Sequence, residues 1–205
     1  MDFYNQAQRD IYERQELSVT EQEKWLAWPQ VLKAVERHRC SVASLMEFQD
    51  QLILSLYTLQ APVRLDYGDM RVVATEPEKP SGNYLVALPE PYFLFTEYKT
   101  AVKYGAVRIK VSPPLLKVIK EWRDLLPDND FLLVGPKGAP LGEIALGRRI
   151  IDLFTRMTGK AVGISMLRQS FVSHSRKAEA PLATQTALAD SMMHSNSMSQ
   201  LYRRL

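Results

Sequence analysis

The sequence is poor in the residues that build disulfides, zinc sites and nucleotide-binding loops. It holds one cysteine, Cys40, and three histidines in 205 residues, so no disulfide can form within the chain. The histidines and the cysteine are too scattered to supply the clustered ligands of a zinc site. No GxxxxGK segment occurs, so hydrolysis of a nucleotide at a loop of that type has no support.

Long apolar runs are also missing. The longest, LILSLYTL at residues 53–60, is far too short to cross a bilayer. The first fifteen residues are too polar and charged to form a secretory signal. We therefore expect an intracellular, soluble protein. A hydrophobic fraction of 46% in a chain of this length allows one domain with a substantial core.

Basic residues prevail outside the N-terminal quarter of the chain. Residues 1–50 carry six Lys/Arg against nine Asp/Glu, whereas residues 51–205 carry twenty against fourteen. Between Lys99 and Arg123 there are seven basic residues and one acidic residue, Glu121. This distribution favours a polyanionic partner for the basic body of the chain, although a solvated surface of uneven charge has the same composition.

The residue patterns predict helices at both ends of the chain and a small sheet between them. Ser18-x-x-Glu21 is a capping-box pattern, and Ser41 is predicted to cap a long apolar helix that ends near Leu59. Four short β-rich segments, separated by turn residues, follow at 70–75, 83–88, 92–97 and 106–111. Helices are predicted again at 115–126, 143–157, 165–178 and 184–193. This order predicts a mostly α fold with a small antiparallel β-sheet (α+β).

Several short segments carry residues suited to chemistry at a phosphodiester. Arg64 follows a helix end, LYT at 56–58, in the loop PVRLDYGDM, and Lys99 lies in EYKTAVKYG. Arg168 lies in the predicted helix LRQSFVSH, and His194 and Tyr202 come near the end of the chain. Two arginines suit the oxygens of a phosphate, because their planar forks match its geometry and keep their charge. In this order the segments resemble the tyrosine recombinase, or phage-integrase, family over about residues 20–205. They look most like the branch found in large eukaryotic DNA viruses and related mobile elements.

The resemblance implies a tyrosine-recombinase-like catalytic domain that cuts and rejoins DNA strands at specific sites. It implies that Tyr202 attacks a phosphate to form a 3′-phosphotyrosine intermediate, and that Lys99 protonates the departing 5′ oxygen. Arg64, Arg168 and His194 would stabilise the charged transition state. No cofactor and no metal ion are implied, because the covalent link to the tyrosine stores the bond energy.

Four further residues have supporting roles in this interpretation. Lys103, four residues beyond Lys99 in the same turn, is the alternative general acid. Asp66 is expected to orient the loop of Arg64, and Ser165 to contact the phosphate. His174 is expected to make a structural hydrogen bond, because a residue six positions after Arg168 cannot share its direction on an ideal helix.

The sequence departs from the family pattern at places that bear on proton transfer. Ser165 stands where the family has the histidine of its His-x-x-Arg motif, and Gln169 replaces a histidine that often follows the arginine. His194 precedes Tyr202 by eight residues, whereas nine is usual in the family. These departures leave open a catalytically impaired DNA-binding module. Relaxation of DNA in the manner of a type IB topoisomerase is a second alternative, because that reaction uses similar residues without synapsis.

The resemblance also bears on organisation and partners. Residues 1–20 are expected to form a helical leader or linker, and residues 21–205 the catalytic domain. A separate N-terminal clamping domain is expected to be absent or reduced to residues 1–40. The chain is therefore expected to be an excised catalytic domain, with a naturally minimal enzyme as the alternative. The expected partner is double-stranded DNA, bound by a homotetramer that is a monomer or weak oligomer without it. No membrane is expected, and the expected location is the cytoplasm or a host nucleus.

Overall fold

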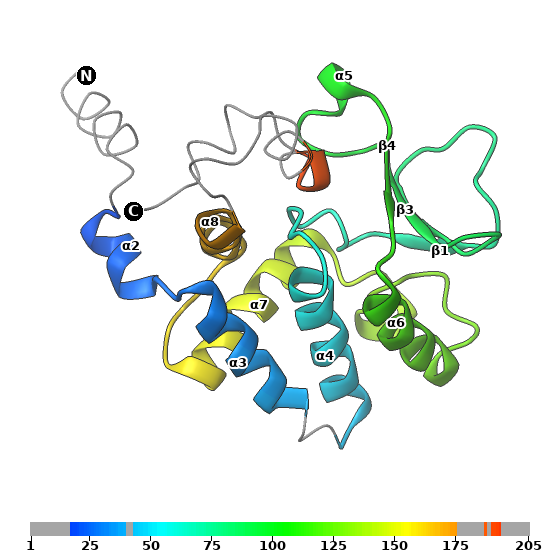
Figure 1. Cartoon of the computed structure of the whole chain (residues 1–205). Coiled ribbons are helices and arrows are strands. Elements are labelled where there is room, and N and C mark those ends of the chain that lie inside the picture. The colour runs from blue at the N-terminus through cyan, green and yellow to red at the C-terminus, as the bar shows by residue number, and fades with distance from the viewer. Residues whose placement is uncertain (1–16, 40–42, 176–186, 188–189, 194–205) are drawn as a thin grey trace.

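The helices that precede the sheet lie on one side of the molecule, and the sheet lies on the other (Figure 1). The structure, a computed structural model, describes residues 17–39, 43–175, 187 and 190–193. The first described helices are α2 (Val19–Lys24), α3 (Trp28–Arg39) and α4 (Leu45–Thr58). Helix α4 runs through the middle of the molecule, with α3 on one side and α6 (Pro113–Leu125) on the other (Figure 1).

The caps of these helices follow local sequence signals. Ser18 and Glu21 form the predicted capping box at the start of α2. The cap predicted at Ser41 is wrong, because Ser44 takes this position and its hydroxyl accepts a hydrogen bond from the backbone N–H of Glu47 at 3.3 Å. Ser44-x-x-Glu47 is itself a capping-box pattern, so the helix begins where a serine and a glutamate have the required spacing.

The sheet has four strands in the order β1-β2-β3-β4. Strands β2 (Asn83–Val86), β3 (Tyr92–Phe95) and β4 (Val107–Lys110) pair antiparallel, as predicted. Strand β1 (Arg71–Val73) departs from the prediction, because it pairs parallel to β2. The connecting residues 74–82 are too many for a tight hairpin turn, and they carry the chain back so that β2 runs in the direction of β1.

The two faces of the sheet are covered differently. Phe93 and Phe95 point into the main core, whereas Leu94 joins a small second cluster with Tyr84 and Val86. This alternation is the period of two that a strand imposes on its side chains. The main core also takes apolar residues from α4, α6, α7 (Glu143–Thr158) and α8 (Ile164–Ser175), so the sheet and the helices share one hydrophobic interior.

The second half of the chain returns to helices where the sequence predicts them. These are α6 (Pro113–Leu125), α7 (Glu143–Thr158) and α8 (Ile164–Ser175), whereas the short helix α5 (Ala101–Tyr104) and the 3-10 turn η1 (Pro136–Gly138) were not predicted. Two prolines begin α6, where missing N–H groups cost little. Within the described ranges no helix is long and apolar enough to cross a membrane. The predicted leader at 1–20 lies mostly outside those ranges.

Candidate active site

The loop between α4 and β1 is held in place by buried tyrosines. The hydroxyl of Tyr57, at the end of α4, donates a hydrogen bond to the backbone carbonyl of Arg64 at 2.9 Å. The ring of Tyr67 is fully buried and packs edge-on against Phe93 and Phe95 of the sheet. The backbone that carries Arg64 is therefore anchored to the core on both sides of the arginine.

Asn83, the first residue of β2, joins this loop to the connection that follows β3. Its amide nitrogen donates to the backbone carbonyls of Asp66 at 3.1 Å and of Glu97 at 2.8 Å. Its amide oxygen accepts from the backbone N–H groups of Thr96 and Glu97, both at 3.1 Å. One side chain thus connects the loop of Arg64 to the backbone two residues before Lys99.

The connection between β3 and β4 carries the two predicted lysines in different environments. The Tyr98 hydroxyl donates to the backbone carbonyl of Gly105 at 2.8 Å, which closes the base of the connection. Lys99 is exposed and lines the cavity described below. Lys103, on α5, is also exposed, but its Nζ lies 5.1 Å from the centroid of the Tyr104 ring, and it is not among the residues that line the cavity.

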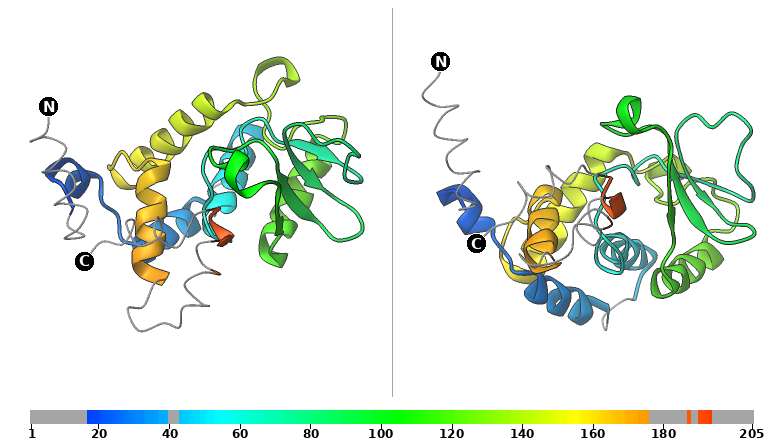
Figure 2. Two further views of the ribbon diagram at one scale, coloured as in Figure 1. Left: turned by 90° about the horizontal axis from the view of Figure 1, so that it is seen from above. Right: turned by 45° about the horizontal axis from the view of Figure 1, so that its top comes forward.

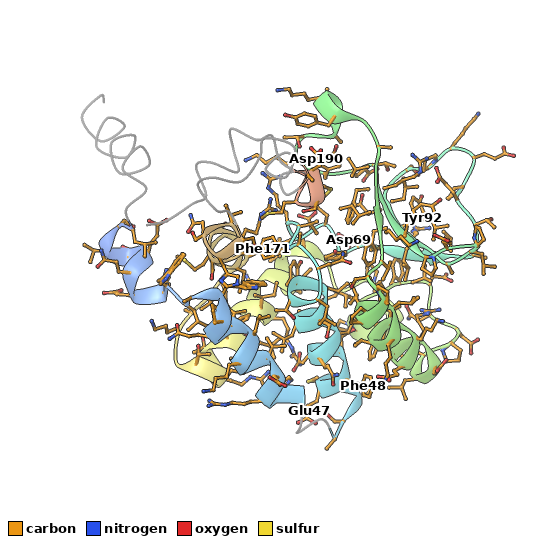
Figure 3. All side chains as sticks on the ribbon, viewed as in Figure 1. Glu47, Phe48, Asp69, Tyr92, Phe171 and Asp190 are labelled. Atoms are coloured by element: carbon orange, nitrogen blue, oxygen red, sulfur yellow. The ribbon has the colours of Figure 1, made fainter. Side chains whose placement is uncertain are left out.

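Helix α8 brings two predicted residues to the cavity. Ser165 and Arg168 are three positions apart, so they share one face of the helix. Ser165 is exposed on the cavity wall, whereas Arg168 is only 1% exposed. Phe171 packs against Trp28 of α3, with ring centroids 5.0 Å apart, and holds the helix in place (Figure 3).

The last described segment of the chain lies against Arg168. Nη2 of Arg168 donates to the backbone carbonyl of Met192 at 3.1 Å. Met192 and Met193 are buried. Figure 2 shows the segment 190–193 beside the loop that follows α4. His194 and Tyr202 lie outside the described residues, and His194 follows this segment directly in the sequence.

Arg64, Lys99, Ser165 and Arg168 line one cavity of about 470 Å³. The side chains that form its wall come from the loop after α4, from the start of the connection between β3 and β4, and from the first turns of α7 and α8. His174 is exposed on α8 and is not among the lining residues. Three segments that are distant in the sequence therefore bring two guanidinium groups and one ammonium group together.

The charges that line the cavity are balanced. Three lining residues are cationic and three are anionic: Arg64, Lys99, Arg168, Asp66, Glu97 and Glu143. Nη1 of Arg64 is buried and has no hydrogen-bond partner among the residues that the structure describes. A buried donor without an acceptor is unfavourable, and an anion in the cavity would supply the missing acceptor.

Asp66 is the most perturbed acid of the cavity. Burial, followed by the nearby charge of Glu143, raises the pKa of its carboxyl to about 6, although Arg168 and Arg64 oppose the shift. The sequence predicted that Asp66 orients the loop. The contacts that hold the loop here are the backbone contact to Asn83 and the Tyr57 contact to Arg64.

Three other tyrosines lie near these groups. Burial raises the pKa of Tyr57 and of Tyr67 above the ordinary value, so both hydroxyls stay protonated and are poor nucleophiles. Tyr98 lines the cavity, but its hydroxyl donates to Gly105, and partial burial raises its pKa as well. Of these three tyrosines, Tyr98 alone lines the cavity, so it has to be tested against Tyr202.

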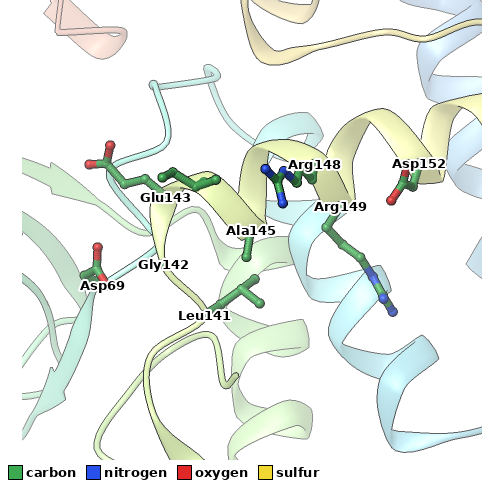
Figure 4. A pocket seen from close by; sticks show the side chains of 9 residues that line it. Asp69, Leu141, Gly142, Glu143, Ala145, Arg148, Arg149 and Asp152 are labelled. Atoms are coloured by element: carbon green, nitrogen blue, oxygen red, sulfur yellow. The ribbon is translucent and has the colours of Figure 1, made fainter. Parts of the chain in front are cut away.

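A larger cavity of about 740 Å³ lies on the other side of the start of α7 and contains none of the predicted residues. Figure 4 shows Arg148 and Arg149 extending from α7, and Asp69 near the first residue of this helix. Glu143 lines both cavities. Two arginines and three carboxylates line this cavity, whereas the smaller cavity has three cations against three carboxylates.

Sequence reasoning missed the residues that assemble the site. Asn83 and Glu143 lie outside the segments that carry the resemblance. Tyr98 lies within one of them, EYKTAVKYG, but had no assigned role. Only the place of Glu143 in the first turn of α7, directly after the N-cap Gly142, is visible in the sequence, as an acidic residue at the start of a predicted helix. Their contribution depends on contacts between segments far apart in the chain.

No family model matches the sequence, and no curated protein matches it. Several solved structures match its fold. The crystal structure of XerA recombinase matches with a TM-score of 0.63 at 15% identity, over 88% of this chain and 58% of that one. XerH site-specific recombinase bound to palindromic difH substrate, in a post-cleavage complex, matches with a TM-score of 0.62 at 16% identity, over 89% of this chain and 49% of that one. Its pre-cleavage complex with difH matches with a TM-score of 0.57 at 15% identity, over 89% of this chain and 50% of that one.

These likenesses confirm the predicted fold, a mostly helical tyrosine-recombinase fold with a small sheet. The chain spans between 49% and 58% of the length of the recombinases that it matches.

Proposed function

We propose that this chain cuts and rejoins DNA strands through a 3′-phosphotyrosine intermediate formed at Tyr202. The observation that carries the proposal is the convergence of Arg64, Lys99 and Arg168 on one cavity in a chain with a recombinase fold. The cavity has the chemistry of a phosphodiester site, because forked guanidiniums bind the non-bridging oxygens and an ammonium group can protonate a departing oxygen.

The two arginines would stabilise the transition state. As the tyrosine oxygen approaches phosphorus, negative charge grows on the non-bridging oxygens, and fixed positive charges lower the energy of that state most. The buried Nη1 of Arg64, which has no acceptor among the described residues, is suited to this position. Arg168 is held by the Met192 carbonyl, so its guanidinium is already oriented before the substrate binds.

Lys99 would act as the general acid. The bond from the Tyr202 oxygen to phosphorus forms while the bond from phosphorus to the 5′ oxygen breaks, and Lys99 gives its proton to that oxygen. The reverse attack by a 5′ hydroxyl rejoins the strands, so the energy of the broken bond is kept and neither ATP nor a metal ion takes part. His194, which follows Met193 in the sequence, would contact the phosphate or the tyrosine.

Double-stranded DNA is the proposed partner. Residues 51–205 carry an excess of six positive charges, and one matched recombinase was solved on its difH substrate. We extend the proposal to a homotetramer on DNA, to residues 21–205 as the catalytic domain, and to integration by a virus or mobile element. The last point rests on the segments PVRLDYGDM, EYKTAVKYG and LRQSFVSH.

A nicked suicide substrate tests the proposed reaction. Cleavage next to a nick releases a short fragment, so rejoining fails and the covalent protein–DNA adduct accumulates. We expect an adduct that survives denaturing gel electrophoresis and that mass spectrometry maps to Tyr202. Tyr202→Phe removes the nucleophilic oxygen and should reduce the adduct below detection.

Tyr98→Phe is the matched control, because Tyr98 lines the cavity and its phenol is the alternative nucleophile among the described residues. This variant should still form the adduct. An adduct on Tyr98 would contradict the assignment of the nucleophile. Salt-dependent DNA binding without any adduct would favour the impaired DNA-binding module, and adduct formation with relaxation of plasmids but no synapsis would favour a topoisomerase.

The role of Lys99 can be separated from DNA binding by changing the leaving atom. Lys99→Ala should slow cleavage by about a hundredfold or more, because the 5′ oxygen then leaves without a proton. A substrate with sulfur at the bridging 5′ position should restore most of the rate, because a thiolate leaves without protonation. The measurement is the single-turnover rate of adduct formation on the oxygen and sulfur substrates.

Lys103→Ala is the control for this experiment, since Lys103 has the same charge and lies four residues further on. It should cleave the oxygen substrate at close to the wild-type rate. If the sulfur substrate rescues Lys103→Ala and leaves Lys99→Ala slow, then Lys103 is the general acid and the assignment is wrong.

A further inference from the structure

A carboxyl group lies among the cations of the candidate cavity. Asp66 lines the cavity with Arg64, Arg168 and Glu143, and it is only 5% exposed. Its Oδ2 is buried, and no described residue forms a hydrogen bond with it. A buried carboxylate oxygen that no donor contacts is unfavourable, whereas the protonated acid carries an O–H donor of its own.

Charged and titratable groups face Asp66 from several elements. Glu143 at the start of α7 disfavours the ionised form, while Arg64 on the same loop and Arg168 of α8 favour it. The remaining neighbours are tyrosines at the end of α4, in the loop and after β3, and two charged residues of the β3 connection: Tyr57, Tyr67, Tyr98, Glu97 and Lys99. A hydrogen bond from the backbone N–H of Asp66 to its own carboxylate also favours the ionised form. The balance of these effects leaves the pKa of Asp66 at about 6, with burial as the main cause of the rise and Glu143 as the second.

We propose that Asp66 takes up a proton when a phosphodiester enters the cavity, and that its carboxylic acid then donates a hydrogen bond to a non-bridging phosphate oxygen. The inference rests on the proposed function, because it takes the DNA phosphate as the ligand. The proton comes from solvent, and no bond to phosphorus forms or breaks in this step.

The charge balance of the cavity supports this proton uptake. Its three cations and three carboxylates cancel while Asp66 is ionised. Protonation of Asp66 leaves one positive charge in excess, which matches the single negative charge of a phosphodiester. The arriving anion itself disfavours the carboxylate form and raises the pKa of Asp66 further.

The proposal also accounts for a departure from the family pattern. Ser165 lines the cavity at the position of the family's histidine, and a serine hydroxyl does not change charge near neutral pH. Asp66 gives the cavity a group that titrates in this range. It would contact the substrate directly and set how binding of the phosphate depends on pH.

The test is calorimetric titration of the full chain with the dinucleoside monophosphate TpT. This probe has one phosphodiester and no group that titrates between about pH 5.5 and 8.5. The wild-type affinity should rise by about tenfold as the pH falls across this range, which corresponds to a rise of about one pH unit in the pKa of Asp66 on binding. Titrations at pH 7 in two buffers of different ionisation enthalpy should show uptake of a fraction of a proton.

Asp66→Asn keeps the shape of the side chain and a hydrogen-bond donor but cannot titrate. It should bind TpT at pH 8 at least as tightly as the wild type does at low pH, with no proton uptake and a flat pH profile. Glu143→Gln should move the rise in affinity to lower pH, because Glu143 helps to raise the pKa of Asp66. Asp69→Asn removes a charge three residues away, outside the cavity, and should leave the profile unchanged.

If the affinity of Asp66→Asn for TpT still depends on pH, the inference is overturned. If the pH dependence is instead lost in His194→Gln, the titrating group is His194. These results are independent of strand cleavage. If the adduct forms on nicked DNA but TpT binding takes up no proton, only the role of Asp66 fails. If TpT binding shows the expected linkage but no adduct forms, the cleavage function fails and the protonatable phosphate site remains.

Discussion

Alanine in place of Arg168 is expected to lower the rate of DNA cleavage by about a thousandfold or more. Loss of one fixed donor for a developing negative charge costs about 10²–10³ in rate, and loss of an arginine on a transferring phosphoryl group costs more. Arg168 is 1% exposed and lines the cavity with Arg64. In the alanine variant, water therefore cannot readily take its place and stabilise the charge on the phosphate oxygens. The measurement is the single-turnover rate of adduct formation with protein in excess over nicked DNA.

Arg168 also has a structural contact, and the variants have to separate the two roles. Its Nη2 donates to the Met192 carbonyl, so alanine leaves both a void and an acceptor that has lost this donor. Arg168→Lys keeps the positive charge and much of the volume but loses the fork, and it should cleave about a hundredfold more slowly than the wild type. Thermal unfolding of each variant shows how much of the loss comes from the fold.

Arg148→Ala is the matched control, because Arg148 is an exposed arginine of α7 that lines the neighbouring cavity. It should retain the cleavage rate at saturating protein, even if its affinity for DNA falls. Cleavage by a folded Arg168→Ala at a rate similar to Arg148→Ala would remove Arg168 from the site.

Gly68→Ala is expected to lower the free energy of unfolding by about 3 kcal/mol or more. A Cβ at this position would lie 2.5 Å from the backbone nitrogen of Glu143 and 2.7 Å from the carbonyl carbon of Gly142. Both atoms belong to backbone that cannot turn aside, and the Gly68 carbonyl accepts a hydrogen bond from Gly142 N–H at 3.0 Å. The loop of Arg64 must therefore move away from the start of α7, which also separates Arg64 from Glu143 in the cavity.

Gly147→Ala is the control for this prediction. A Cβ at Gly147 would meet Cδ1 of Leu65 at 3.2 Å, which is the end of a flexible side chain. Alanine also favours the helix over glycine by about 0.5–1 kcal/mol, so the net change should stay within about 1 kcal/mol. Chemical denaturation measures both variants, and equal stabilities for Gly68→Ala and Gly147→Ala would show that the loop does not pack on α7 at this point.

The helices and strands were largely predictable because their signals are local. The capping box at Ser18, the prolines at the start of α6 and the alternation in β3 each act within a few residues. The parallel pairing of β1 was not predictable in this way. It depends on how residues 74–82 return along the sheet, and neither strand encodes the direction of its neighbour.

The candidate site was predictable in part. Arg64, Lys99 and Arg168 were found from short motifs in a fixed order, and they line one cavity. The resemblance favoured Lys99 over Lys103, but both lysines lie in one short turn with the same charge, and only the structure shows that Lys99 lines the cavity and Lys103 does not. The role of Asn83 as a clamp between two loops had no local signal, since its partners are 14 and 17 residues away.

By itself the sequence determined the composition of the site, namely two arginines, a lysine and an acid on segments with identifiable ends, and it determined the class of fold. Only the tertiary structure decided which of these groups share one cavity and that the carboxyl group of Asp66 is buried. The physical reason is that charge and hydrogen-bonding capacity belong to each residue, whereas burial and proximity depend on contacts between distant segments. The raised pKa of Asp66 depends on both, because it arises from a carboxyl group of ordinary chemistry that is buried near Glu143.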